Sequence, residues 1–240
     1  MACFARGIPS AGGKRFLLRI GVSVCGFFLL FGGSAQSGEV PVLGRRVAIQ
    51  WAFGALPAGG GELRAMGRES VLKTGDRLKM MVQLDKTGYV YVLHQDAGEE
   101  ITLLFPNGLE QFDSDYRIGQ AYYVPRGEDW YELDGKTGRE VFTLIVSPER
   151  LTDLEKLYTC YASSQGEQKG EWKKRLQDEI RALKKQQLEL AAPAERPVTI
   201  GGTVRGLQKP LVKERPDVAS IANPIQSDGI VVKVFSIDHR

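Results

Sequence analysis

Residues 88–106 read GYVYVLHQDAGEEITLLFP, and this stretch decides the fold. Apolar side chains recur at every second position on both sides of a short polar segment, the pattern of two strands that each bury one face. The segment between them, residues 96–99 (DAGE), has turn chemistry. The stretch therefore predicts a β-hairpin. Its same-face residues are Tyr89, Tyr91 and Leu93 on one arm and Ile101, Leu103 and Phe105 on the other.

Short alternating runs continue on both sides of the hairpin. They cover residues 46–53, 77–84, 122–124, 130–133, 141–146 and 229–237. Short strands spaced roughly ten residues apart are typical of an all-β fold and not of a nucleotide-binding α/β fold. We therefore expect a mainly β protein, an antiparallel β-sandwich that is immunoglobulin-like or barrel-like, with residues 36–148 as its core.

The period changes after residue 148. Thr152 and Glu155 have the spacing of a capping box and predict a helix through about Tyr161. After a polar break at 163–170, apolar residues at helical spacing predict a second helix over 172–190: Trp172, Leu176, Ile180, Leu183 and Leu190. The expected order is a helical segment (149–191), a proline-rich irregular passage (192–228) and a closing strand (229–240).

The N-terminal 35 residues have the layout of an export signal. They contain four basic residues and no acidic one, followed by the apolar run 20–31 and then Gly33-Ser34-Ala35. This order predicts a cleavable signal peptide cut after Ala35. The run of about 12 residues is shorter than the roughly 20 needed to span a bilayer, so an uncleaved anchor is the less favoured alternative. We expect a bacterial protein exported to the periplasm, the outer envelope or the medium.

Removal of the signal peptide also changes the net charge of the chain. The whole chain has 32 basic and 29 acidic residues, a net charge of +3. Without residues 1–35, 28 basic residues face 29 acidic ones and the net charge becomes −1. This net charge gives no electrostatic reason to expect a nucleic-acid partner. Contact with a membrane is expected only through the transient signal peptide.

Several short motifs between residues 70 and 148 resemble a known family. They are residues 72–76 (LKTGD), 88–93 (GYVYVL), 103–107 (LLFPN), Val124-Pro125 and 138–140 (GRE). In order and spacing they resemble the bacterial family called domain of unknown function 4384. The strand ending in Asp238-His239-Arg240 resembles the close of longer members. The resemblance implies an exported or surface-exposed β domain and carries over no catalytic residue.

The motif residues also have structural explanations. Gly75 and Asp76 are turn formers, and Pro106 with Asn107 can end a strand. We expect the tyrosines to pack inward. The motif set predicted to be structural is Gly75, Asp76, Tyr89, Tyr91, Leu104, Phe105, Pro106, Asn107, Pro125, Gly138 and Glu140.

The sequence contains no recognisable catalytic set. His94 and His239 are its only histidines and lie far apart in the chain, so we predict no metal site and no cofactor. A group of acidic residues matches no calcium-loop spacing and is expected to occupy solvated turns. These residues are Asp96, Glu99, Glu100, Asp113 and Asp115.

The sequence therefore favours a non-catalytic module that binds an envelope protein or a surface ligand. Aromatic residues concentrated between polar ones are the candidate binding residues, with core packing as the alternative for some of them. They are Phe112, Tyr116, Tyr122, Tyr123, Trp130 and Tyr131. Two alternatives stay open. One is a structural component of a secretion or surface complex that docks through the 172–190 helix; the weaker is a hydrolase using Asp113, Asp115 or Glu128.

Overall fold

The computed structural model describes residues 46–190 and 216–240. Its helices are α1 (Gln111–Ser114), α2 (Thr152–Ser163) and α3 (Gly166–Leu190), with a 3-10 turn η1 (Val218–Ile221). The strands are β1 (Val47–Leu56), β2 (Arg64–Ala65), β3 (Glu69–Leu72), β4 (Arg77–Leu84), β5 (Tyr89–Gln95), β6 (Ile101–Phe105), β7 (Ala121–Val124), β8 (Tyr131–Glu132), β9 (Gly138–Ser147), β10 (Asn223–Ser227) and β11 (Val231–His239). Each predicted strand and both predicted helices are present; β2, β3, β10 and α1 were not predicted.

The strands form two sheets. The first has the order β10-β1-β4-β7, with β2 paired to β1 and β8 to β4, and its strand pairs are antiparallel. The second has the order β3-β11-β9-β5-β6. Here β3 runs parallel to β11, so the prediction of a wholly antiparallel fold is wrong in this pair. The two strands come from distant parts of the chain, and no hairpin forces them to run in opposite directions. The barrel-like alternative is also wrong, because both sheets keep free ends.

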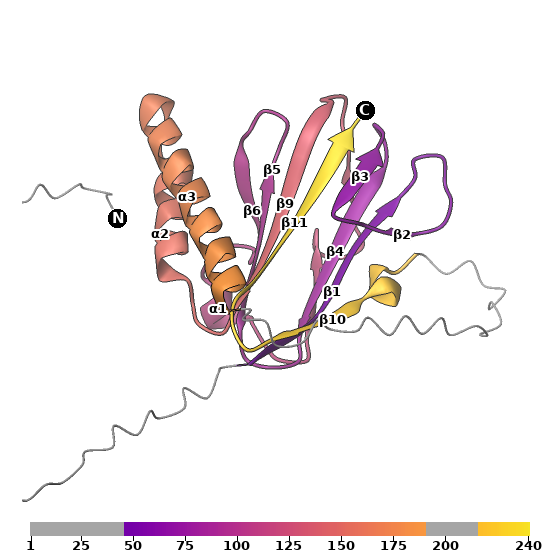
Figure 1. The fold of residues 1–240 in the computed structure, drawn as a ribbon. Helices are drawn as coiled ribbons and strands as arrows, with labels where there is room; N and C mark the ends of the chain where they lie inside the picture. Colours follow the sequence, from indigo (N-terminus) through magenta and orange to yellow (C-terminus); the bar gives the residue numbers. More distant parts are fainter. Residues whose placement is uncertain (1–45, 191–215) are drawn as a thin grey trace, which may run out of the picture. The chain divides into compact units, whose positions relative to one another are not determined.

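The two sheets share one hydrophobic core. Phe53 of β1 lies between Phe142 of β9 and Phe235 of β11, with ring centroids 5.0 and 5.4 Å away. Met80 and Val82 of β4 add apolar side chains from the first sheet, and Val90, Val92 and Leu144 add them from the second. Figure 1 shows the second sheet between the first sheet and the two long helices.

Both long helices pack on the outer face of the second sheet. Apolar side chains from the sheet and the helices form a second buried cluster, which includes Tyr91, Leu93, Ile145, Leu154, Tyr161, Leu176 and Leu183. Alternate residues of β5 thus point into two different cores: Val90 and Val92 into the first, Tyr91 and Leu93 into the second. The helical segment is therefore part of the packed fold.

Helix α2 is fastened to the second sheet by tyrosine hydroxyl groups. Tyr161 Oη accepts from Ile101 N at 2.9 Å, and Tyr158 Oη accepts from Leu103 N at 3.1 Å. Tyr91 Oη donates to Glu155 Oε1 at 2.7 Å. Arg150 also binds Glu155 and reaches Asp113, both through paired hydrogen bonds of 2.9 and 3.0 Å. These bonds fix α2 over β5 and β6.

Two local predictions about the helices are wrong. Thr152 is not a capping residue, because α2 begins there and its cap, Leu151, makes no side-chain bond. Glu155 instead accepts hydrogen bonds from Tyr91 and Arg150, neither of which is part of a capping box. The expected polar break at 163–170 shrinks to Ser164 and Gln165, because α3 already starts at Gly166. Two lysines of α3, Lys169 and Lys173, form ion pairs with Glu100 and Glu99 at the β5–β6 turn.

Part of the predicted irregular passage is regular. Residues 223–227 form β10 on the edge of the first sheet, beside β1. Pro224 is compatible with this place because an edge strand has backbone groups that need no partner strand. The rest of that passage up to residue 215, the predicted signal peptide and its cleavage site at Ala35 lie outside the described residues.

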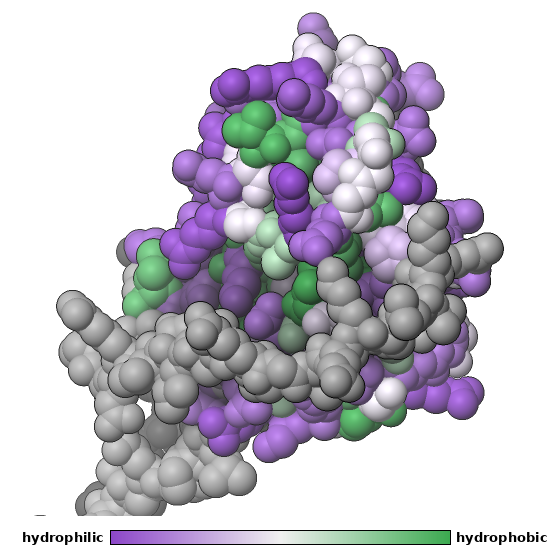
Figure 2. All heavy atoms as spheres, turned by 90° about the vertical axis from the view of Figure 1, so that its right-hand side faces the viewer, coloured by the Kyte–Doolittle hydropathy of each residue, from purple (hydrophilic) through white to green (hydrophobic). Residues whose placement is uncertain are grey.

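On the face shown in Figure 2, hydrophilic residues predominate and hydrophobic atoms show as separate patches among them. Among the described residues, no helix is long and apolar enough to cross a membrane.

Leucines on two sides of α3 test whether the helical cover stabilises the sheet. Leu176 is fully buried and Leu188 is 68% exposed. Leu176→Ala should lower the free energy of unfolding by about 2–5 kcal/mol, because it leaves a cavity in the second core. Leu188→Ala, the same change on the solvent side, should cost no more than about 0.5 kcal/mol in the same urea titration. Equal effects of the two changes would contradict the packing of α3 on the sheet.

Candidate functional site

Two pockets adjoin along the side of the molecule where β6 and β7 are the last strands of their sheets. We call the pocket that His94 and Glu140 line the upper pocket, with a volume of about 230 Å³. The lower pocket, which Phe105 and Tyr122 line, has a volume of about 420 Å³. Leu104 and Tyr131 line both. All other lining residues also lie between Leu78 and Phe142. We call the two pockets together the β6–β7 groove. It brings strand edges, loops and polar side chains from both sheets to one place.

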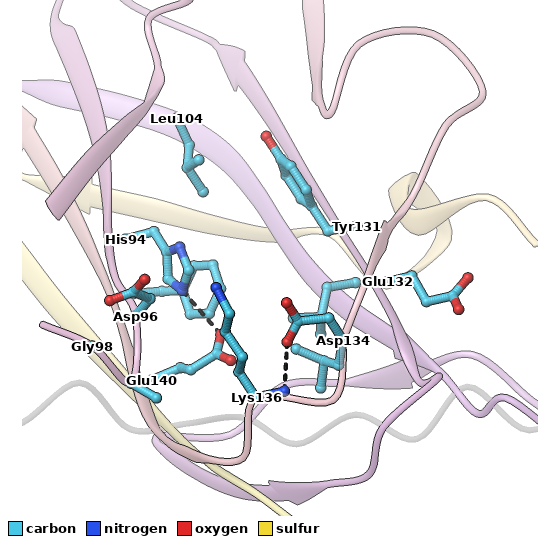
Figure 3. A pocket seen from close by; sticks show the side chains of 13 residues that line it. His94, Asp96, Gly98, Leu104, Tyr131, Glu132, Asp134, Lys136 and Glu140 are labelled. Carbon is cyan, nitrogen blue, oxygen red and sulfur yellow. Dashed lines mark hydrogen bonds and ion pairs between the residues drawn. The ribbon is translucent and has the colours of Figure 1, made fainter. Parts of the chain in front are cut away.

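A hydrogen-bonded histidine and carboxylate form the polar side of the upper pocket (Figure 3). His94 Nε2 lies 3.0 Å from Glu140 Oε2. The His94 ring stacks on Phe142, with 4.3 Å between centroids, because the two residues are directly opposite on β5 and β9. The imidazole is thus held in place on one side by a ring and on the other by a carboxylate.

The second histidine reaches the same carboxylate from β11. His239 is fully buried, and its Nδ1 lies 3.4 Å from Glu140 Oε1, within ion-pair range but outside hydrogen-bond geometry. Its Nε2 lies 3.1 Å from Thr74 Oγ1. The Thr74 hydroxyl donates its one proton to Asp134 O, so His239 Nε2 must be the donor to Thr74.

Glu140, on β9, thus lies between two histidines that come from the neighbouring strands β5 and β11. We call His94, Glu140, His239 and Thr74 the histidine–glutamate cluster.

The aromatic residues predicted to bind a ligand do not gather in one place. Phe112, Tyr116 and Tyr122 pack on one another, with centroids 4.9 and 5.9 Å apart along the series. Tyr116 Oη accepts from Val90 N and Tyr122 Oη from Arg117 N. Burial raises the pKa of both phenols. These three residues pack largely within the fold, although Tyr122 also reaches the lower pocket.

Tyr123 and Trp130 flank a buried lysine. The ammonium of Lys79 lies 5.5 Å from the ring centroid of Tyr123 and 5.6 Å from that of Trp130. It donates to the backbone oxygens of Gly127 and Asp129, both at 2.7 Å. Desolvation by burial lowers the pKa of Lys79, although Asp129 and Asp217 act in the opposite direction. This contact holds the β7–β8 loop, and only Tyr131, 36% exposed, stands at the meeting point of both pockets.

The motif residues have structural roles, and several also line the groove. Gly75 has a φ of +86°, and the Asp76 carboxylate accepts from Ala58 N and Lys73 N, which is the predicted turn chemistry. Gly138 must be glycine because a Cβ there would lie 2.7 Å from Ala97 Cβ. The motif residues that line the groove are Leu104, Phe105, Asn107, Pro125 and Glu140. The peptide bonds before Pro106 and Pro125 are cis.

The carboxylates considered for hydrolysis lie in different places. Asp113 is bound by Arg150, Asp115 lines the lower pocket and Glu128 lines a separate pocket beside Lys79. The acidic residues of the β5–β6 turn pair with lysines of α3. In the part of the chain that the structure describes, no group of three or more His, Cys, Asp or Glu residues is arranged to hold a metal ion.

The fold and the site define a two-sheet domain with a helical cover and a groove at one side. Residues 71–150 match the family model of a domain of unknown function, DUF4384. This part of the chain is therefore a DUF4384 domain, as the motifs at 70–148 predict, and it contains all residues that line the groove. Neither curated proteins nor solved structures gave a match to the chain.

Glu140 is the centre of the histidine–glutamate cluster, and its removal should destabilise the fold. Glu140→Ala removes the hydrogen-bond partner of His94 Nε2 and the carboxylate beside buried His239, and we expect a loss of about 1–3 kcal/mol in chemical denaturation. Glu140→Gln should lose less, because an amide can accept from His94 and donate to His239 Nδ1. Glu132→Ala, on an exposed residue nearby, should change the stability by no more than about 0.5 kcal/mol. If Glu140→Ala were as harmless as Glu132→Ala, the cluster would not contribute to stability.

Lys79 should make the stability depend on pH. Its folded pKa is lower than the ordinary value of 10.5, so in the range just below 10.5 the unfolded chain binds more protons at this group. Its contribution to the free energy of unfolding should therefore rise with pH in that range. The stability of the wild type minus that of Lys79→Met should increase between about pH 8 and pH 10.

The buried tyrosines act in the opposite direction, because burial raises the pKa of Tyr91 and Tyr116, but they are common to both proteins and cancel in the difference. Exposed Lys86, changed to Met, serves as the control and should show no such rise. A difference for Lys79→Met that stays flat or falls would contradict the assignment.

Proposed function

We propose that this chain is an exported binding module of the bacterial cell envelope, and that its DUF4384 domain holds a segment of another protein in the β6–β7 groove. One observation carries the proposal: two neighbouring pockets within this domain share Leu104 and Tyr131 in their walls. Binding sites are typically concave and largely apolar, with a few polar groups that fix orientation. The groove is concave and is lined by apolar residues such as Leu104 and Phe105 beside a larger share of polar and charged ones.

Tyr131 and Leu104 are the proposed contact residues. Tyr131 is the most exposed of the six candidate aromatic residues, and a tyrosine supplies apolar area together with a polar end. Aromatic residues of this kind often carry much of the binding energy of an interface. His94 and Glu140 offer fixed polar groups beside them. A partner segment that crosses the point shared by both pockets would contact all four residues.

Export rests on the sequence. Residues 1–35 have the order of a signal peptide, and the chain without them has a net charge of −1. The proposed place of action is the periplasm, the outer envelope or the medium, and the proposed partner is a protein and not a nucleic acid. The two sheets would serve as the scaffold of a sandwich-like module, with the site built on its strand ends and loops.

Neither alternative function gains support from a particular observation. Docking through the helix at 172–190 would need an apolar face, yet Leu176 and Leu183 are buried against the second sheet and α2. A hydrolase with paired carboxylates would need two of them in one pocket, and Asp113, Asp115 and Glu128 lie in different surroundings. Both alternatives remain proposals of lower rank.

Crosslinking in living cells tests the groove directly. A photoreactive phenylalanine analogue in place of Tyr131 should give a crosslinked protein species on irradiation, because a bound partner lies within reach of this side chain. The same analogue at Leu188, which is 68% exposed on α3, is the matched control and should not give that species. The products are compared by immunoblot and identified by mass spectrometry.

Second variants keep the result interpretable. Leu104→Asp in the Tyr131 photoprobe background should remove the crosslinked species, since it places a charge in the shared wall of the two pockets. Unfolding curves establish whether each variant is folded. Identical products from the Tyr131 and Leu188 positions, or no product from Tyr131 in a folded and exported protein, would overturn the proposed site.

A further inference from the structure

Strand β7 leaves one edge open beside the groove. It pairs with β4 on one side and is the last strand of the first sheet among the described residues. Every residue from Ala121 to Pro125 lines the lower pocket. The backbone N–H and C=O groups of an edge strand form a ready template for another extended chain. The opposite wall of the pocket comes from the end of β6 and from α1, including Phe105 and Gln111.

The other three sheet ends differ from β7. The β6 edge is closed by α2, because Tyr161 and Tyr158 accept from the amides of Ile101 and Leu103. Strand β10 carries Pro224, which cannot donate to a neighbouring strand. Strand β3 is as short as β7 but lines none of the described pockets. Of these four sheet ends in the described residues, the β7 edge is therefore the one that combines an open template with a pocket beside it.

The charge of the groove indicates which side chain it accepts. Five carboxylates line it, from Asp96, Asp115, Glu132, Asp134 and Glu140, against the basic side chains of Arg126 and Lys136. In Figure 3, Asp134 and Glu140 face the upper pocket, whereas Glu132 points away from it. Lys136 extends toward His94, so the upper pocket already contains one ammonium group that belongs to the protein. Charge complementarity therefore favours a ligand with a positive charge, which would compete with Lys136 for the carboxylates of the pocket.

We propose that the partner segment is an extended peptide with a basic side chain, which adds as a strand to the free edge of β7 and directs the lysine or arginine into the upper pocket. The backbone pairing supplies sequence-independent affinity, and the pocket supplies the preference for a positive charge. This inference rests on the proposed function, because it specifies the occupant of the same groove.

Synthetic peptides test both parts with the full-length protein. The probes are acetyl-Thr-Val-Lys-Val-Thr-amide, the same peptide with Glu in place of Lys, and the Lys peptide with alternate backbone amides methylated. Binding is followed by NMR on the backbone amides of residues 121–124. The Lys peptide should bind about three- to tenfold more tightly than the Glu peptide, a range typical of one partly exposed charge contact. The methylated peptide should bind at least about tenfold more weakly, since it cannot pair with an edge strand.

Variants of the pocket test whether it prefers a positively charged side chain. Asp134→Asn should weaken the Lys peptide by about threefold or more, because it removes a negative charge while its amide oxygen still accepts from Lys136 N. Lys136→Gln should strengthen the same peptide, because it removes the competing cation. Glu167→Gln on α3, which removes a negative charge outside the groove, is the control and should change nothing.

The outcomes separate the two proposals. Tighter binding of the Glu peptide, loss of Lys-peptide binding in Lys136→Gln, or equal affinity of the methylated peptide would each overturn the inference. If no peptide binds while the Tyr131 crosslink persists in cells, the inference fails and the proposed function stands. If the crosslink is also absent, both fail.

Discussion

The structure depends on the burial of β5 and β9 on both faces. Valines and phenylalanine on one side of these strands face the first sheet, while Tyr91, Leu93 and Ile145 face the helices. A strand whose two faces are both apolar cannot leave one of them in water without losing about 25 cal/mol for each Å² of apolar area exposed. The second sheet must therefore be covered on both sides. One cover is the first sheet, and the other is the pair α2 and α3, which follows the DUF4384 domain in the chain.

The helical cover also determines where the molecule stays open. Because α2 lies over β5 and β6, its tyrosine hydroxyl groups reach the amides at the outer edge of β6 and take the place of a partner strand. Nothing comparable is described for β7, the corresponding edge of the first sheet. The same packing that stabilises the second sheet thus closes one wall of the groove and leaves the other with free backbone groups. Stability of the fold and access to the proposed site depend on the same layer arrangement.

Most of the fold could be predicted because its signals are local. The alternation around residues 89–105 and the stripe from Trp172 to Leu183 each identify an element without reference to the rest of the chain. What could not be predicted depends on distant partners. Glu155 has capping-box spacing but is used by Arg150 and Tyr91, and β3 runs parallel to a strand that begins 159 residues after Leu72. Both Tyr131 and Tyr122 line the groove, and only the tertiary structure shows that Tyr131 is exposed there and Tyr122 largely buried.

The histidine–glutamate cluster is the clearest case of information that a single sequence does not carry. Their separation in the chain gives no reason to place His94 and His239 together, yet the structure brings both next to the carboxylate of Glu140. The register explains how: His94 lies opposite Phe142 on one side of β9, and His239 lies opposite Gly138 on the other, so Glu140 stands between them. One residue of the 138–140 motif therefore joins the last residues of β11 to the wall of the groove. A change in β11 that moved His239 would alter the electrostatic surroundings of Glu140 and, through its hydrogen bond, the position of His94 in the upper pocket.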